Sequence, residues 1–114
     1  MNQKNLTLYL NGKTIKIQNI KKCNEFEKIF GLMFKLKDKT NPLLFEFSKP
    51  TTMAIHSLFV FSSFLALWLD DKNQIQEIRK VDPFKLSIKP KKPFSKLVEI
   101  PLNSKYSSLV RELS

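Results

Sequence analysis

MAIHSLFVFSSFLALWL, residues 53–69, is the stretch of sequence that decides the fold. Its 17 residues are at the short limit for a membrane-spanning helix, because such a helix needs about 20 apolar residues. The stretch contains His56 and three serines, and it is closed by Pro50 on one side and Asp70-Asp71 on the other. Polar and charged residues at these places are unfavourable within lipid. We therefore predict the buried centre of a soluble domain and not a membrane anchor.

Two serines near the middle, Ser62-Ser63, divide this stretch into two shorter runs. Residues 55–61 and residues 64–69 each have the length of a strand and are rich in aromatic and branched side chains. Apolar runs of this length are typical of strands that are buried on both faces. The sequence predicts two strands with a break between them.

The N-terminal region carries the clearest local pattern. Leucines at positions 6, 8 and 10 alternate with Thr7 and Tyr9, and isoleucines at 15 and 17 alternate with polar residues. Asn11-Gly12 lies between the two runs, and both residue types tolerate the positive φ angles of a type I′ turn. Alternation with a period of two is typical of strands with one buried face. We predict a β-hairpin over residues 6–17.

The remaining sequence contains short elements separated by turns. The predicted elements are a helix over residues 25–30 capped by Asn24, a strand over residues 44–47 that ends at Ser48-Lys49-Pro50, a turn over residues 70–73, a strand containing Ile75, Ile78 and Val81, an extended loop or edge over residues 82–94, a strand over residues 96–100, and a final helix that contains Tyr106, Leu109, Val110 and Leu113 and is capped by Asn103 or Ser104. Three prolines deny the 82–94 segment a continuous ladder. We predict a single, mainly β domain over residues 1–114, at the margin of the α+β class.

The chain is strongly basic, with a net charge of +10. Such a charge draws a protein toward anionic polymers or membrane surfaces. Eighteen of the twenty basic residues are lysine, so a general composition bias also accounts for the excess without any partner. The charge alone therefore favours no binding site.

No group of residues makes a catalytic or metal site by type and spacing. A nucleophilic serine or cysteine needs a positioned base, and the sequence has one histidine, His56, and one cysteine, Cys23. A single imidazole does not assemble a zinc site without companion ligands. Two glycines in the whole chain do not supply a phosphate-binding loop. We expect no cofactor, and an enzyme is the third-ranked of three functions.

Cysteine usage and the N-terminus bear on the compartment. Cys23 has no second cysteine with which to form an internal disulfide, and no apolar secretory segment follows residues 1–4. Both observations favour a reducing interior. The expected location is the cytoplasm.

A series of motifs extends over residues 30–101. They are Gly31-Leu32-Met33-Phe34-Lys35, Leu43-Leu44-Phe45-Glu46-Phe47, Ile55-His56, Phe59-Val60-Phe61, Leu67-Trp68-Leu69-Asp70, Val81, Pro83-Phe84, Pro90-Lys91-Lys92-Pro93 and Lys96-Leu97-Val98-Glu99-Ile100-Pro101. With these motifs the sequence resembles the domain-of-unknown-function family 192, and the Ile-His pair is similar to its archaeal members. The resemblance implies a small, mostly antiparallel, barrel-like sheet with one or two short helices. It implies no established activity.

The sequence departs from this family between the two central strands. Many members have Pro, an aliphatic residue and Asp there, and the matching residues are Ser63, Phe64 and Leu65. A polar or metal site that depended on that acid is therefore not expected in this chain.

Two binding functions remain as hypotheses. The first is a non-enzymatic binding module for a small molecule or a protein partner, with a pocket formed by His56, Phe59, Phe61, Trp68 and Glu46. The second is a low-specificity nucleic-acid-binding protein that uses the basic stretch Lys85, Lys89, Lys91, Lys92 and Lys96. Phe84 and Phe94 lie within that stretch, where they would either stack on bases or anchor the loop to the domain.

Overall fold

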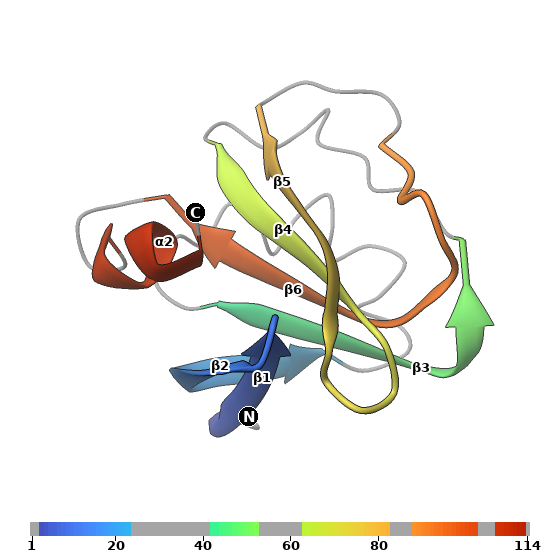
Figure 1. The fold of residues 1–114 in the computed structure, drawn as a ribbon, viewed down its shortest axis with the longest axis horizontal. Helices are drawn as coiled ribbons and strands as arrows, with labels where there is room; N and C mark the ends of the chain where they lie inside the picture. Colours follow the sequence, from blue (N-terminus) through green and yellow to red (C-terminus); the bar gives the residue numbers. More distant parts are fainter. Residues whose placement is uncertain (1–2, 24–41, 53–62, 83–87, 103–106, 114) are drawn as a thin grey trace.

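The computed structural model describes residues 3–23, 42–52, 63–82, 88–102 and 107–113. In these ranges it contains six strands and one helix (Figure 1). The elements are β1 (Gln3–Leu10), β2 (Lys13–Cys23), β3 (Leu43–Thr51), β4 (Phe64–Leu69), β5 (Ile75–Val81), β6 (Phe94–Pro101) and α2 (Ser107–Leu113). The predicted helix over residues 25–30 and the first half of the central apolar stretch, residues 55–61, lie outside the described residues.

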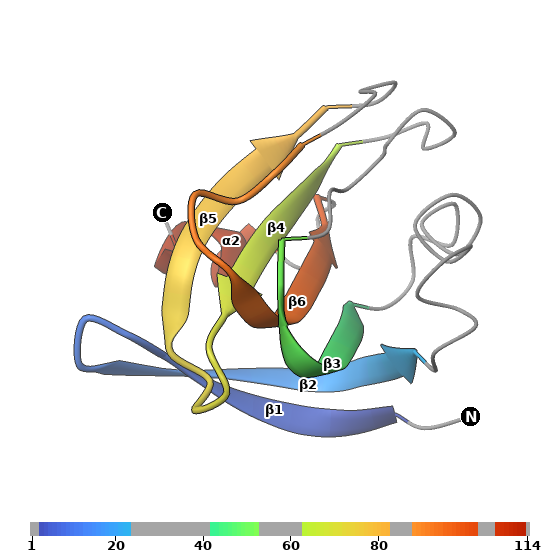
Figure 2. The ribbon, with the colours of Figure 1, turned by 90° about the vertical axis from the view of Figure 1, so that its right-hand side faces the viewer.

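The strands form one sheet in the order β1-β2-β3-β6-β4-β5. All neighbouring strands are antiparallel except β2 and β3, which run parallel. The sheet curls so that its two edges meet at one place, where the backbone N–H of Tyr9 donates to the carbonyl of Asn73 at 3.0 Å. Figure 2 shows the resulting open half-barrel, with β1 and β2 crossing below the other four strands. The predicted mainly β, barrel-like fold is confirmed.

The N-terminal hairpin forms as predicted. Asn11 and Gly12 have φ angles of 51° and 80°, so both central residues of the turn are in the left-handed region that a type I′ turn requires. β2 then contains an irregularity that the alternation does not reveal. Asn19 has a φ of 59° and adds one residue to β2 relative to β1. This bulge turns Ile20 to the same face as Ile17, and both are buried.

An inner cluster of apolar side chains joins all six strands to α2. Its buried members are Leu6, Leu8, Ile15, Ile17, Ile20, Leu44, Leu65, Leu67, Leu69, Val98, Ile100 and Leu113. β5 adds the partly buried Ile75 and Ile78, which pack against these residues. Because every strand contributes to it, this cluster fills the inside of the curled sheet. α2 contributes Leu113, with Leu109 and Val110 packed beside it, which fits the predicted helical spacing.

An outer cluster lies on the opposite face of β3, β4, β5 and β6. It consists of Leu43, Phe45, Phe64, Ala66, Trp68, Val81, Phe94 and Leu97. β4 is buried at all six positions, because alternate residues enter the inner and the outer cluster. The unbroken apolar run that predicted a strand buried on both faces is explained by this arrangement.

The boundaries of β3 and β6 differ from the prediction. β3 continues through Pro50 to Thr51, whereas the sequence suggested that it ends at Ser48-Lys49-Pro50. Between Glu46 and Thr51 five steps along β3 correspond to two along β6, so Pro50 lies in an exposed irregularity where no ladder donor is needed. β6 begins at Phe94, two residues before the predicted start.

The turn over residues 70–73 is confirmed. One carboxylate oxygen of Asp70 accepts hydrogen bonds from the backbone N–H groups of Lys72 and Gln74, at 2.8 and 2.9 Å. Asn73 takes a positive φ of 65°, which asparagine tolerates.

The described residues contain no helix of the length and apolarity that crossing a membrane requires.

Candidate functional site

Of the five residues predicted to form a ligand pocket, the structure describes two. His56, Phe59 and Phe61 lie outside the described residues. Trp68 belongs to the outer cluster, whereas Glu46 alternates with Phe45 along β3 and shares the inner face with Leu44. The structure therefore does not bring Trp68 and Glu46 together.

Trp68 is fully buried on β4. It lies opposite Leu97 of β6 and Glu77 of β5 in the two ladders. The guanidinium carbon of Arg79 is 5.3 Å from the centroid of its ring, a cation–π contact. The indole N–H is buried and has no hydrogen-bond acceptor among the described residues. Because a buried donor without an acceptor costs free energy, this N–H is a candidate contact for a ligand.

Glu77 and Arg79 bind the segment that precedes β6, residues 88–92, and hold it against β5. The Nε of Arg79 donates to Glu77 at 2.8 Å, its Nη2 contacts the same carboxylate oxygen, and Nη2 also donates to the carbonyl of Lys89 at 2.9 Å. The backbone N–H of Lys91 donates to the other oxygen of Glu77 at 2.8 Å. Burial acts to raise the pKa of Glu77, but the hydrogen bonds from Lys91 and Arg79 outweigh it and lower the pKa. Glu77 is therefore a carboxylate at neutral pH.

A small pocket lies between β5 and this segment. It has a volume of about 120 Å³ and is lined by Trp68, Gln76, Glu77, Pro90, Lys91 and Lys92. Pockets for drug-sized ligands are larger, at about 300–1,000 Å³. The pocket thus has room for a small polar group, with lysines at its rim and the buried tryptophan in its wall.

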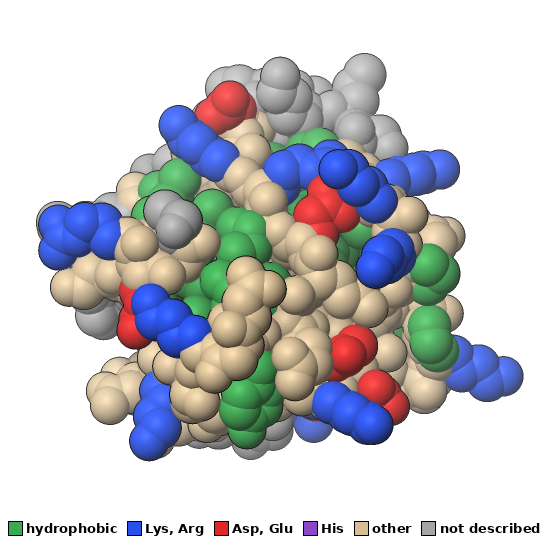
Figure 3. Space-filling view, in the orientation of Figure 1, with side chains coloured by type: hydrophobic (Ala, Val, Ile, Leu, Met, Phe, Trp, Pro, Cys, Tyr) green, Lys and Arg blue, Asp and Glu red, His purple; other side chains and the backbone are tan. Residues whose placement is uncertain are grey.

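The predicted basic stretch is divided by the structure. Lys89, Lys91 and Lys92 are exposed beside β5, and Lys85 lies outside the described residues. Phe94 is only 1% exposed, and its ring packs edge-on against that of Phe47, with 5.6 Å between the ring centroids. Phe94 therefore anchors the start of β6, and its ring is not accessible for stacking on a nucleobase. In Figure 3 the basic side chains are spread around the visible face, with acidic side chains among them.

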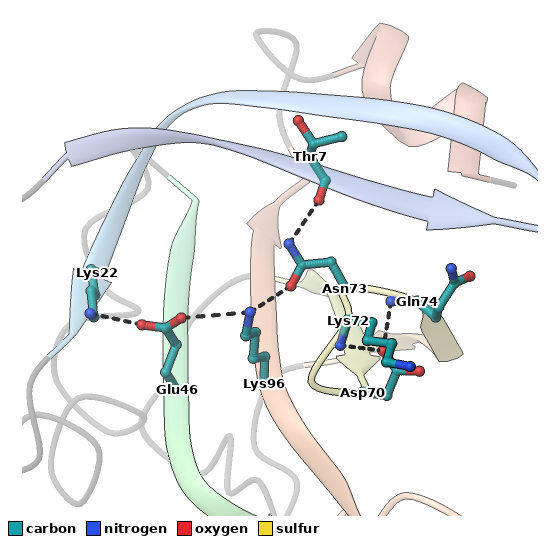
Figure 4. A network of polar contacts seen from close by, with 8 residues as sticks. All are labelled: Thr7, Lys22, Glu46, Asp70, Lys72, Asn73, Gln74 and Lys96. Carbon is teal, nitrogen blue, oxygen red and sulfur yellow. Dashed lines mark hydrogen bonds and ion pairs between the residues drawn. The ribbon is translucent and has the colours of Figure 1, made fainter.

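Lys96, the fifth residue of that stretch, instead joins a polar network at one end of the half-barrel (Figure 4). Its Nζ donates to the side-chain oxygen of Asn73 at 2.6 Å and lies 3.8 Å from Glu46. Glu46 pairs with Lys22 at 2.8 Å, and the Asn73 amide donates to the carbonyl of Thr7 at 3.0 Å. The network connects β1, β2, β3, β6 and the β4–β5 turn. Glu46 and Lys96 therefore support the barrel and do not line the pocket beside Trp68.

The sequence did not lead us to predict Glu99 as a candidate functional residue. Glu99 lies in β6 and is 1% exposed, and neither carboxylate oxygen has a hydrogen-bond partner among the described residues. Burial raises its pKa well above the ordinary value of a glutamate. A carboxyl group inside the apolar run Leu97–Ile100 of the predicted strand over residues 96–100 was the available signal, because buried charges are normally paired.

The described residues offer no ready metal site. No three His, Cys, Asp or Glu side chains within these ranges lie close enough together to hold an ion. The groups that the geometry makes available for chemistry are therefore the Trp68 N–H, the Glu99 carboxyl and the lysines beside the pocket.

The comparisons with known proteins concern the fold. No protein-family profile matches the sequence, and no curated protein matches it. A structure from Sinorhizobium meliloti 1021, provisionally described as a transcription regulator, is similar at 15% identity with a TM-score of 0.71, over 96% of this chain and 87% of that one. A protein of unknown function from Novosphingobium aromaticivorans DSM 12444 is similar at 12% identity with a TM-score of 0.67, over 93% of this chain and 76% of that one. At these identities the likeness shows the half-barrel fold alone.

Proposed function

We propose that this protein is a non-enzymatic binding module that takes a small anionic or strongly hydrogen-bond-accepting group in the pocket beside Trp68. The observation that carries the proposal is the buried indole N–H of Trp68, which has no acceptor among the described residues and belongs to a residue that lines the pocket. An acceptor bound there would recover the free energy that the unpartnered donor costs. The group would belong to a small molecule or to a side chain of a protein partner.

The charges at the pocket rim favour an anion. Lys91 and Lys92 line the pocket and are exposed, so their ammonium groups are available to a carboxylate or phosphate. Glu77 also lines the pocket, but its carboxylate is occupied by Arg79 and by the Lys91 backbone. Hydrogen bonds between charged partners are about twice as strong as neutral ones, so the lysines would supply much of the affinity.

Trp68 provides a direct test because it is the only tryptophan in the sequence. Titration with inorganic phosphate and with acetate should change its fluorescence in a saturable way. Lys91→Gln and Lys92→Gln should each weaken the effect by about tenfold or more, since a hydrogen bond to a charged group contributes about 1.5–3 kcal/mol. Lys16→Gln is the matched control, because Lys16 is an exposed lysine on β2.

Native mass spectrometry of freshly purified protein tests the same proposal without a chosen probe. A retained small molecule that is lost in the Lys91→Gln variant would support it. Protein that carries no ligand, together with a linear fluorescence response to both probes, would contradict it.

A low-specificity nucleic-acid-binding function is the second candidate. It is favoured by the three exposed lysines Lys89, Lys91 and Lys92 in one short segment and by the net charge of +10. The description of the Sinorhizobium meliloti structure as a provisional transcription regulator is compatible with it. Binding should then fall steeply with salt, and charge reversal of Lys91 and Lys92 should reduce it further. An affinity that is constant across a salt titration would exclude this function.

We further propose that the chain is a divergent member of domain-of-unknown-function family 192 and acts in the cytoplasm. The barrel-like, mostly antiparallel sheet supports the first statement, since it is the fold that the resemblance implies. The absence of a second cysteine supports the second. Fractionation of cells that express a tagged full chain would test the location.

A further inference from the structure

β5 ends the sheet on one side and leaves one of its edges unpaired. It is the last strand in the order of the sheet, and only Gln74, just before it, forms a bridge with Tyr9 of β1. Among the described residues, no backbone hydrogen bond reaches the free edge of β5 between Glu77 and Val81. The pairing with β4 is regular over these five residues, a length of about 16 Å. Such an edge is a template for pairing with a further strand.

The strand at the other end of the sheet, β1, has an edge that is already used in part. The backbone N–H of Tyr9 donates to the Asn73 carbonyl at 3.0 Å, and the Thr7 carbonyl accepts from the Asn73 amide at 3.0 Å. The β4–β5 turn thus occupies edge groups of β1. Of the two edges, that of β5 is the more available to a partner.

A strip of partly exposed aliphatic side chains lies beside the free edge of β5. All its members pack against the inner cluster, and they come from β1, from β5, from the residue after β6 and from α2. This apolar strip consists of Leu10, Ile75, Ile78, Leu102, Leu109 and Val110. Figure 3 shows apolar side chains gathered between the positions that α2 and β5 occupy in Figure 1. Contiguous apolar patches on a surface are typical of interaction sites.

Basic side chains flank the apolar strip. By the strand register, Lys13 at the start of β2 and Lys80 of β5 project from the same face of the sheet as the inner cluster. Their side chains are 54% and 63% exposed. Their acidic neighbours Glu112 and Asp82 lie 4.0 and 3.8 Å away, and exposed pairs contribute little. Both lysines are therefore available to the acidic groups of a partner.

We propose that the free edge of β5 and the apolar strip bind an extended segment of a partner protein, with aliphatic side chains between two acidic ends. The backbone of this segment would pair with Glu77–Val81 as a further strand, and alternate side chains would pack on the apolar strip. Its acidic ends would face Lys13 and Lys80. A second copy of this chain is a poorer occupant, because each copy carries a net charge of +10 and like charges would meet.

This interface is independent of the proposed function. The pocket beside Trp68 lies on the outer-cluster face of β5, whereas the apolar strip belongs to the inner face. Lys91→Gln, which should weaken anion binding in that pocket, should therefore leave binding of the extended segment unchanged.

Titration of the full chain with a fluorescein-labelled peptide, Glu-Thr-Val-Thr-Val-Thr-Glu, tests the proposal. When extended, this peptide is about 23 Å long and has its valines and both glutamates on one face. Its fluorescence anisotropy should rise in a saturable way. The same peptide with lysine in place of both glutamates should bind at least tenfold more weakly, because two attractions become repulsions.

Variants of the protein test the strip and its flanking charges. Lys13→Glu and Lys80→Glu should each weaken peptide binding at least threefold. Ile78→Thr should weaken it about tenfold, because it removes apolar contact area. Lys16→Glu is the matched control, since it makes the same change in net charge at an exposed position on the other face of β2. Circular dichroism verifies that each variant is folded.

Two measurements test strand addition itself. The backbone donors of alternate residues point to opposite edges of a strand, so N-methylation of the valines and N-methylation of the threonines should differ. One set should abolish saturable binding, and the other should change it less than threefold. In hydrogen exchange, the edge-facing amides within Glu77–Val81 should exchange at least tenfold more slowly with saturating peptide, whereas those of β1 should not change.

Four results would overturn the proposal. The first is equal tolerance of the two N-methylated peptides, and the second is exchange within Glu77–Val81 that the peptide does not change. The third is full protection of these amides without peptide, which would assign the edge to another part of this chain. The fourth is a dimer in analytical ultracentrifugation that Ile78→Thr dissociates, which would assign the strip to a second copy. Peptide binding without any phosphate or acetate binding would contradict the proposed function and leave this interface standing.

Discussion

Replacement of Glu99 with glutamine should make the stability of the protein less dependent on pH. Because burial raises the pKa of Glu99 in the folded state, the folded chain binds more protons than the unfolded chain at intermediate pH. Stability is then complete below the pKa of about 4.3 that a glutamate has in the unfolded chain. It is lost as the pH rises from there toward the raised pKa of the folded state. Glutamine carries no such proton and does not impose this loss.

The magnitude follows from the linkage between protonation and folding. Each pH unit in this window reduces the free energy of unfolding by about 1.4 kcal/mol. Between pH 5 and pH 6 the wild type should therefore lose on the order of 1 kcal/mol relative to Glu99→Gln. Small domains are stable by about 5–15 kcal/mol, so a loss of this size is a measurable part of the total. In urea it corresponds to a midpoint shift of about 0.3–1 M.

Urea unfolding followed by Trp68 fluorescence, repeated at half-unit steps from pH 5 to pH 7, measures this difference. Glu112→Gln serves as the control, since Glu112 is an exposed glutamate on α2. A constant difference between wild type and Glu99→Gln across the series would refute the reasoning. It would mean that Glu99 titrates alike in the folded and unfolded chains.

Three other substitutions test the fold. Gly12→Ala should cost about 1 kcal/mol or more, because Gly12 has a φ of 80° with open space around it; thermal unfolding that is unchanged would contradict the turn. Asn73→Ala should reduce the free energy of unfolding in urea by about 2–3 kcal/mol, because it removes the hydrogen bonds to Thr7 and Lys96 and places alanine at a φ of 65°. Asn73→Gly removes the same hydrogen bonds but tolerates this φ, so its loss should be smaller. Equal losses for the two variants would contradict a contribution from the positive φ. Leu67→Ala should cost about 2–5 kcal/mol because Leu67 is fully buried; a loss below about 1 kcal/mol would place it outside the core.

The parts of the fold that could be predicted from the sequence have local causes. Asn11-Gly12 sets the hairpin turn, and the alternation around it gives each strand a buried face. The run Phe64–Leu69 indicated a strand with both faces covered, and its six residues enter two clusters. The bulge at Asn19 and the parallel pairing of β2 with β3 were not predicted, because each depends on contacts that the flanking residues do not encode.

The candidate site was less predictable for a similar reason. Glu46 and Lys96 were assigned to two different functions, although they face each other in the β3–β6 ladder. They are separated by 50 positions in the sequence, and only the strand register brings them together. Glu99 illustrates the opposite case, because its position inside the apolar run Leu97–Ile100 is a local signal. An acid in a strand normally indicates a solvent-facing side chain, however, so this signal is easily misread. Glu99 is buried because both faces of β6 are covered.

The meeting of β1 and β5 has a consequence for the order of folding. The Asn73–Thr7 hydrogen bond joins residues 66 positions apart, so its loop is long and its closure is entropically costly. The β1–β2 hairpin, in contrast, needs only a two-residue turn and forms within microseconds. We expect the hairpin to form early and to dock against β5 late, since pairings distant in sequence slow folding. Pulse-labelled hydrogen exchange should show early protection within the hairpin and later protection at the Tyr9 N–H, whose acceptor is the Asn73 carbonyl.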